Sequence, residues 1–196
     1  MPKKQHLFGV GCRLHTGNQG RLQLSAASNT YMLPNQLRLV DGTIVRKCPT
    51  EKPLYCSRAG KFYSIHNAIL TDDGWILREV KPNLNQTRLS TWVSSRGISG
   101  SQYPTIRQSH GQPCHKLVAL AWLGPRPEGM EIDHLNGNKL DWSVDNLEYV
   151  TPAENRKRAG LLRVLRNIGR DPKKMSREEL LAIFNKYYFA NPKNID

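Results

Sequence analysis

Three polar residues in the second half of the chain have the types needed for hydrolysis assisted by a metal ion. Asp133 and His134 are consecutive, and Asn155 follows a short way downstream. A carboxylate and an amide oxygen suit a hard cation such as Mg²⁺, which keeps several of its waters. A neutral histidine beside that cation can take a proton from water. These residues predict metal-assisted proton transfer, provided that the fold brings them together.

The surrounding pattern predicts two strands and a helix in the right order. Segments 131–134 and 147–150 are typical of short strands, and the turn residues Asn-Gly-Asn lie between them at 136–138. The sequence Thr-Pro-Ala-Glu at 151–154 predicts a helix start, with a threonine cap, a proline in the first turn and a glutamate that completes a capping box. If the strands pair antiparallel, the helix start returns to the end that carries Asp133.

Four motifs in this region follow one another in the order of a known family. They are His115-x-Leu117-Val118-Ala119, Asp133-His134-x-Asn136-Gly137-Asn138-Lys139, Asn146-Leu147-Glu148 and Thr151-x-x-Glu154-Asn155. In type and spacing they resemble the HNH homing endonucleases of bacteriophages, whose shared core is a ββα-metal fold. The resemblance implies that Asp133 and Asn155 bind one divalent cation, Mg²⁺ or Mn²⁺. It also implies that His134 is the general base and that Asn146 holds the loop and orients His134.

The chain departs from the family pattern at one place. The family often has two asparagines after the Gly-Asn-Lys loop, where this chain has Asp141-Trp142. This difference puts the hydrogen bonds inside the loop in question, but not the expected metal or base positions. His115 matches the family pattern, and we expect it to be a packing or helix-capping residue because no partner for it is visible in the sequence.

The first half of the chain predicts a small antiparallel sheet. Residues 1–30 show no sustained periodicity and are expected to form a flexible arm, and Asp41-Gly42 suits the two-residue turn of a hairpin. Candidate strands follow at Phe62–Ile65, Trp75–Leu77, Thr91–Val93 and Tyr103–Ile106. The pattern Tyr55-x-Ser57-x-x-Gly60-x-x-Tyr63-Ser64 is similar to the β-rich segment that often precedes the nuclease in this family.

Apolar residues at helical spacing predict a short buried helix over 115–123, and Ser176 with Glu179 begins a final helix. We therefore expect an α+β protein with four parts. These are a basic, partly flexible arm with a hairpin (1–50), a β-rich DNA-binding region (51–112), the ββα-metal nuclease core (113–160) and a C-terminal helical DNA-binding region (161–196).

The charge of the chain favours a polyanionic partner. Of its 196 residues, 29 are Lys or Arg and 16 are Asp or Glu, which gives a formal charge of +13. Residues 1–98 carry 14 basic and 5 acidic side chains, so the excess is not confined to one tail. No apolar run is long enough to span a membrane, and the N-terminal apolar stretch is too short for a signal peptide. We therefore expect a cytoplasmic protein, in a bacterial host cell if the gene belongs to a phage.

A basic cluster follows the expected active site along the chain. Its position beside the metal favours contact with DNA phosphates over a merely solvated helix face. The arginines expected to bind double-stranded DNA are Arg156, Arg158, Arg163, Arg166 and Arg170.

A zinc site is the weaker alternative for metal binding. Cys12, His15, Cys48 and Cys56 could form one, but the spacing between the last two is unusual, so zinc is not expected.

The resulting hypothesis is an HNH endonuclease that acts as a monomer on DNA and cuts one strand, since each chain has one active site. Two other functions stay open at this stage. One is a DNA-binding protein that keeps the fold without cleavage, and the other is a basic RNA-binding module.

Overall fold

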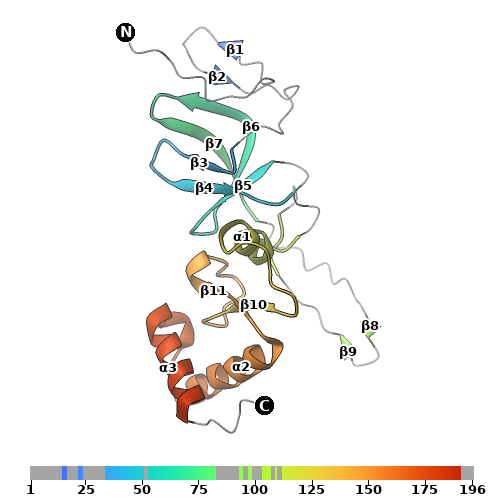
Figure 1. The fold of residues 1–196 in the computed structure, drawn as a ribbon, viewed down its shortest axis with the longest axis vertical. Helices are drawn as coiled ribbons and strands as arrows, with labels where there is room; N and C mark the ends of the chain where they lie inside the picture. Colours follow the sequence, from blue (N-terminus) through green and yellow to red (C-terminus); the bar gives the residue numbers. More distant parts are fainter. Residues whose placement is uncertain are drawn as a thin grey trace.

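The computed structural model describes residues 34–50, 53–82, 103–106, 109 and 112–190, and four two-residue strands. An antiparallel β-rich half precedes a half that contains the helices, which confirms the α+β class (Figure 1). Among the described residues, no helix is long and apolar enough to cross a membrane.

Seven strands form the main sheet, in the order β1-β2-β6-β5-β4-β3 with β7 beside β6. Their bounds are His15–Thr16 (β1), Leu22–Gln23 (β2), Gln36–Arg38 (β3), Ile44–Lys47 (β4), Leu54–Ser57 (β5), Phe62–Thr71 (β6) and Gly74–Val80 (β7). Neighbouring strands pair antiparallel. A parallel bridge between Leu39 and Trp75 brings the end of β3 against β7, so the sheet curls around its apolar face. The sheet draws strands from both sides of the boundary predicted at residue 50.

The predicted hairpin around Asp41-Gly42 exists, but its turn has three residues instead of two. The Leu39 N–H donates to the Thr43 carbonyl at 2.8 Å, which leaves residues 40–42 as the loop. Gly42 has φ +83°, the left-handed conformation required at the last position of such a loop. The Asp41 carboxylate accepts from the Thr43 N–H at 2.8 Å and so stabilises the turn.

The remaining predictions for the first half have mixed outcomes. β6 and β7 confirm the strands predicted at 62–65 and 75–77. The segment 103–106 is not a strand, and only an isolated bridge joins Thr105 to Pro113. Most of the arm predicted at 1–30 and residues 91–92 lie outside the described residues. Within that arm, β1 and β2 are strands of the sheet, and farther on β8 (Val93–Ser94) pairs with β9 (Gly97–Ile98).

Helix α1 (Cys114–Trp122) joins the two halves through one core. Its buried residues Leu117, Val118 and Ala119 pack with Leu54 and Phe62 of the sheet. The same cluster includes residues 144 and 147 from the second half. Figure 1 shows α1 between the sheet and the β10–β11 hairpin. This core fixes the sheet relative to the predicted catalytic segment.

The predicted order of strand, loop, strand and helix is confirmed. β10 (Glu131–His134) pairs antiparallel with β11 (Leu147–Val150), and α2 (Pro152–Asn167) follows directly. The Thr151 side chain caps α2 by accepting from the Glu154 N–H at 3.2 Å. The glutamate half of the predicted capping box is absent, because the Glu154 carboxylate binds Arg158 instead.

Helix α3 (Arg177–Ala190) folds back against α2 around a third small core. Ser176 and Glu179 form a complete capping box, with reciprocal hydrogen bonds of 2.8 and 3.2 Å. Leu162 and Leu165 of α2 pack with Leu180 and Phe184 of α3 and with Leu135, which directly follows β10. The C-terminal helices therefore support the loop that leaves His134.

Candidate metal and catalytic site

Asp133 lies in β10 and faces α2. It is 8% exposed, and Arg158 Nη1 lies 3.5 Å from its Oδ2. This oxygen is buried and accepts no hydrogen bond from the described residues. Burial raises the pKa of Asp133, and the nearby Arg158 opposes the rise. A bound cation would satisfy the oxygen and favour the ionised carboxylate.

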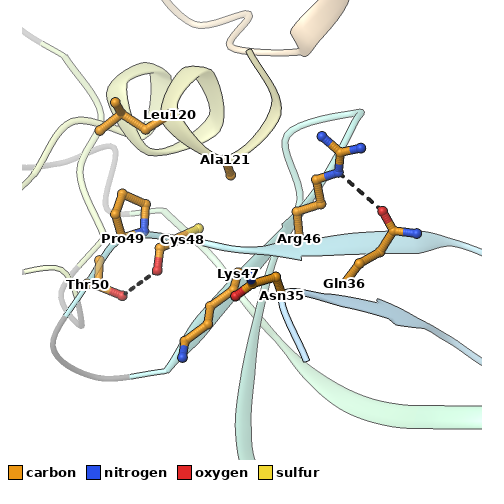
Figure 2. A pocket seen from close by; sticks show the side chains of 9 residues that line it. All are labelled: Asn35, Gln36, Arg46, Lys47, Cys48, Pro49, Thr50, Leu120 and Ala121. Carbon is orange, nitrogen blue, oxygen red and sulfur yellow. Dashed lines mark hydrogen bonds between the residues drawn. The ribbon is translucent and has the colours of Figure 1, made fainter. Parts of the chain in front are cut away.

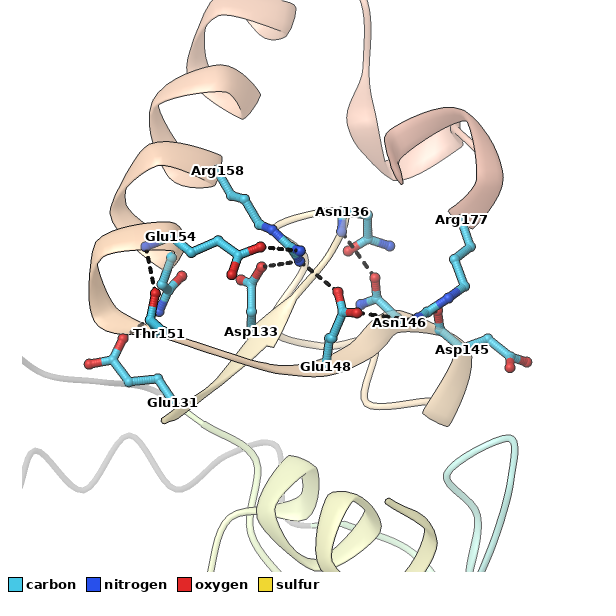
Figure 3. Close-up of polar contacts among 11 residues, drawn as sticks. Glu131, Asp133, Asn136, Asp145, Asn146, Glu148, Thr151, Glu154, Arg158 and Arg177 are labelled. Carbon is cyan, nitrogen blue, oxygen red and sulfur yellow. Dashed lines mark hydrogen bonds and ion pairs between the residues drawn. The ribbon is translucent and has the colours of Figure 1, made fainter. Parts of the chain in front are cut away.

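Arg158 gathers three carboxylates on this face of the hairpin (Figure 3). Its guanidinium donates to Glu148 Oε2 at 2.7 Å and to Glu154 Oε1 at 2.6 Å, and Asp133 is the third carboxylate. Only 6% of Arg158 is exposed, and its guanidinium lies over the ring of Phe184. The prediction that Arg158 contacts DNA is therefore wrong, because the side chain is buried and already paired.

Asn155 reaches the face of β10 that carries Asp133. Its Nδ2 donates to Glu131 Oε2 at 2.6 Å, and Glu131 shares a strand face with Asp133 because side chains alternate along a strand. The structure thus brings Asn155 over this face, although its amide group is bonded to Glu131, two residues before Asp133. The amide oxygen of Asn155 takes no part in this hydrogen bond.

The donor set on this face fits a hard divalent cation. Three carboxylates meet Arg158, and Arg177, at 3.8 Å from Glu148, adds a second positive charge. The group therefore has a net negative charge in a chain of formal charge +13. In the part of the chain that the structure describes, no group of three or more His, Cys, Asp or Glu side chains is placed to hold a metal. With only Asp133 and Asn155 as the predicted protein ligands, a cation such as Mg²⁺ would keep several of its waters.

His134 faces the opposite side of β10, toward α1. Its ring lies 5.2 Å from the His115 ring and 6.0 Å from the Tyr103 ring, measured between centroids. Burial lowers the pKa of His134 to about 4, against a smaller opposing effect of Asp141. Burial likewise lowers the pKa of His115 to about 4. Both imidazoles are therefore neutral at neutral pH, the form in which a histidine can accept a proton.

Asn146 holds the loop between the two strands, as expected. Its side-chain oxygen accepts from the Asn136 N–H at 3.0 Å, and its Nδ2 donates to the Asp141 carbonyl at 2.8 Å. Its backbone carbonyl accepts from the Leu135 N–H at 3.0 Å. Asn146 thus fixes the backbone that directly follows His134, without a contact to the imidazole among the described interactions.

The departure from the family pattern at Asp141-Trp142 leaves the loop intact. Asp141 Oδ2 accepts from Asn136 Nδ2 at 3.1 Å, and Asp141 Oδ1 accepts from the Ser143 hydroxyl at 2.7 Å. Trp142 turns toward the sheet, where its Nε1 donates to the Gly60 carbonyl at 2.8 Å. The two residues therefore tie the loop to itself and to the β5–β6 turn.

A comparison with protein families found a match that covers this strand–strand–helix unit. The model of a family described as HNH endonuclease matches residues 113–157. These are the residues of α1, the β10–β11 hairpin and the start of α2. We call residues 113–157, which match this family, the HNH domain.

Two relatives each match a part of the chain. One is an SPbeta prophage-derived putative HNH homing endonuclease of Bacillus subtilis (strain 168). It is 51% identical to this chain over 41 residues, which cover 21% of this chain and 24% of that protein. The other is an uncharacterized HNH endonuclease of Acanthamoeba polyphaga mimivirus, 36% identical over 77 residues that cover 37% of this chain and 19% of that protein. The chain thus spans about a quarter or less of each relative. No solved structure matches it.

The other predicted DNA-binding arginines lie on the surface of α2 and just beyond its end. Arg156, Arg163, Arg166 and Arg170 are exposed. Arg156 and Arg163 are seven residues apart and share the side of α2 that faces away from its buried residues. Arg166 extends toward the catalytic loop, since a Cβ added at Gly137 would lie 2.9 Å from its Nη2. These four side chains are available to a polyanion.

Two cavities flank Arg46 on the sheet side of α1. One has a volume of about 690 Å³ and includes Lys47, Leu120 and Ala121 in its lining (Figure 2). The other, of about 580 Å³, is lined in part by Arg58, Lys61 and Trp122. The Arg46 guanidinium lies over the Trp122 ring at 4.6 Å, and Gln36 accepts from its Nε at 3.3 Å. Basic side chains therefore also line hollows in the N-terminal half.

Sequence reasoning missed the positions of Tyr103 and Glu131 beside the predicted site residues. The sequence predicts strands at both positions and gives neither residue a role. The alternation Glu131-x-Asp133 on one strand could have placed Glu131 on the metal face. No local signal could have found Tyr103, because only the packing of segment 103–106 against α1 brings it to His134.

Two of the cysteines named for the alternative zinc site lie in the hydrophobic core. Cys48 and Cys56 are buried side by side in the core that also contains Cys114. Cys12 and the side chain of His15 lie outside the described residues.

Proposed function

We propose that this chain is a metal-dependent DNA endonuclease that hydrolyses one phosphodiester bond per active site and nicks one strand at a preferred site. The observation that carries the proposal is the pair Asp133–His134 at the end of β10. One side chain offers a buried carboxylate oxygen that accepts no hydrogen bond from the described part of the chain, and the other is a neutral imidazole. The pair lies in an HNH domain and the chain is strongly basic, which supports DNA as the substrate.

Asp133 and Asn155 would hold one Mg²⁺ or Mn²⁺ ion through their oxygen atoms. Such an ion supplies positive charge that stabilises the scissile phosphate and the departing 3′ oxygen. Glu148 and Glu154 bind Arg158 at 2.7 and 2.6 Å, while Arg158 lies 3.5 Å from Asp133. The two glutamates therefore neutralise most of the arginine's charge and leave the Asp133 carboxylate for the cation.

His134 would act as the general base. Its neutral ring takes a proton from the attacking water, whose oxygen forms the new bond to phosphorus as the bond from phosphorus to the 3′ oxygen breaks. Asn146 would act on this step indirectly, because it fixes the backbone at Leu135 and Asn136 that holds His134 in place.

The basic surfaces would hold the duplex around this site. Arg156, Arg163, Arg166 and Arg170 would contact phosphates, which positions DNA without reading its sequence. The sheet, with the hollows beside Arg46, would supply the contacts that choose the site. We propose that the protein acts as a monomer, since one HNH domain accounts for one nick.

The direct test is cleavage of a supercoiled plasmid by the purified chain with Mg²⁺ or Mn²⁺. We expect conversion to the nicked circle with either ion and complete loss of cutting in EDTA. Plasmid binding without cutting would instead indicate a DNA-binding protein without nuclease activity. Preferential binding of RNA in competition, with no metal requirement, would indicate an RNA-binding module.

A further inference from the structure

A small aromatic cluster surrounds the proposed general base on the α1 side of β10. The Tyr103 and His134 rings are nearly parallel, at 15° with centroids 6.0 Å apart. The His115 ring meets His134 edge to face, at 67° and 5.2 Å, and meets Tyr103 at 4.3 Å. His134 is only 5% exposed. Two rings from different segments therefore restrict its orientation.

The backbone holds Tyr103 and His115 together without help from β10. The Cys114 N–H donates to the Pro104 carbonyl at 2.8 Å, and Thr105 forms a bridge with Pro113. Lys139 Nζ lies 4.8 Å from the centre of the Tyr103 ring and covers its outer side. The cluster is thus a preformed wall against which His134 packs.

One polar atom of the His134 ring, which packs against this wall, lacks a hydrogen-bond partner among the described residues. His134 Nε2 is buried and forms no hydrogen bond with the described residues. Leaving a buried ring nitrogen unpaired is costly, so a partner that a side-chain rotation can bring close is favoured. His115 is a neighbour that can be this partner, because the unprotonated nitrogen of its neutral ring can accept a hydrogen bond from the N–H of His134.

We propose that His115 is a positioning residue that accepts a hydrogen bond from the Nε2–H of His134 and so fixes the tautomer of this ring. With the proton on Nε2, the lone pair of His134 lies on Nδ1, the nitrogen that then meets the attacking water. In a neutral histidine, a hydrogen bond at one ring nitrogen determines which of the two nitrogens carries the proton. The functional consequence rests on the proposed role of His134 as general base, whereas the tautomer itself does not.

The tautomer can be measured directly in the full-length protein. Long-range ¹H–¹⁵N spectra of histidine-labelled protein distinguish Nε2–H from Nδ1–H, and His134→Ala assigns the signals. We expect His134 in the wild type to be the Nε2–H tautomer. In His115→Phe, which keeps the ring but removes both nitrogens, we expect a mixture of tautomers. His115→Asn restores an acceptor and should recover the Nε2–H form.

The rate of plasmid nicking provides the second readout. A wrong tautomer lowers the catalytic rate by up to ~10⁴-fold where a charged group orients the histidine. His115 is a neutral partner, so we expect His115→Phe to lower the nicking rate by ~10- to 100-fold and to leave the DNA affinity unchanged. His115→Asn should recover part of the lost rate. His66→Phe, at an exposed histidine of β6, is the matched control and should change neither readout.

Two results would overturn the proposal. One is an Nδ1–H wild type, and the other is a His134 tautomer that is the same in His115→Phe as in the wild type. If His115→Phe fails to fold, the proposal still fails if His134 in the folded His115→Asn is not in the Nε2–H form. Cleavage that survives His134→Ala would refute the general-base role but would leave the tautomer measurement to decide the His115 assignment separately.

Discussion

Asp133 and His134 are adjacent in the chain, yet their side chains meet different neighbours on opposite faces of β10. Asp133 faces Arg158 of α2 and the carboxylates that Arg158 binds, and His134 faces Tyr103 and His115. Metal binding and proton transfer can therefore be disturbed separately by substitutions at neighbouring residues.

Replacement of His134 by alanine should remove the base and spare DNA binding. A lost general base typically costs ~10² to 10⁴ in rate. We expect a loss in this range in single-turnover cleavage, with DNA affinity within about twofold of wild type because His134 is neutral and buried. His66→Ala is the matched control. Wild-type cleavage by purified His134→Ala would exclude His134 from the mechanism.

The buried histidines should make the stability of the metal-free protein depend on pH. The pKa of His115 is lowered from 6.5 to about 4, so its contribution is fully present above pH 6.5 and is lost as the pH falls toward 4. The loss for His115 alone amounts to ~3 kcal/mol, because each pKa unit is worth ~1.4 kcal/mol. Denaturant unfolding between pH 7 and pH 5 should show stability falling with pH, less steeply in His115→Phe. An equal slope in the two proteins would contradict the burial of His115.

At the scale of elements, the β5–β6 turn is fixed to the catalytic loop. The Arg58 carbonyl accepts a hydrogen bond from the Val144 N–H at 2.9 Å, and the Arg58 side chain forms an ion pair with Asp145 at 2.6 Å. The Gly60 carbonyl accepts a hydrogen bond from Trp142 Nε1. A Cβ at Gly60 would lie 2.6 Å from the Trp142 ring. This turn is therefore a contact through which the sheet positions the HNH domain.

The substitution Gly60→Ala tests this contact, and Gly42→Ala provides the control. Both glycines have φ near +80°, but a Cβ at Gly42 meets nothing within 4 Å. Gly42→Ala should cost ~1–2 kcal/mol for its backbone alone. Gly60→Ala should cost ~1–3 kcal/mol more, because the Trp142 ring must move. Equal losses in denaturant unfolding would show that Trp142 does not pack on this turn.

Helix α2 separates buried from exposed arginines, and the two kinds should behave differently. Joint replacement of Arg163, Arg166 and Arg170 by glutamine should weaken binding to all DNA sequences alike and reduce the salt dependence by about one unit of slope per lost phosphate contact. Arg158→Gln should instead destabilise the fold by ~3–5 kcal/mol, since it removes a buried charge from the buried Asp133 carboxylate and from the half-buried Glu148 and Glu154. Fluorescence anisotropy at several salt concentrations and unfolding curves measure the two effects. A salt slope unchanged in the triple variant would remove these arginines from the DNA contact.

The elements of the HNH domain could be predicted from the sequence because their signals are local. The turn at 136–138 and the cap at Thr151 each depend on residues within a few positions of one another. The environment of Arg158 could not be predicted, because a charged helical residue looks exposed until its partners on β10 and β11 are known. The contact between Tyr103 and His134 was equally hidden, since it depends on packing between distant segments.

At the scale of the whole molecule, the sheet and the HNH domain share one hydrophobic core through α1. Charge is distributed unevenly over this framework. The chain is strongly basic, but the face of β10 that carries Asp133 collects three carboxylates around one buried arginine. A basic surface that attracts DNA around a local site of negative charge is what a metal-dependent nuclease requires.

The most direct test of the account is single-turnover nicking of a supercoiled plasmid over a range of Mn²⁺ concentrations, for the wild type, Asp133→Asn and Asp72→Asn. Asp72, an exposed carboxylate in the β6–β7 turn, is the matched control. We predict that Asp72→Asn follows the wild-type curve, and that Asp133→Asn loses at least ~100-fold in rate at the Mn²⁺ concentration that saturates the wild type. Wild-type cleavage by Asp133→Asn at the same Mn²⁺ concentration would contradict the account.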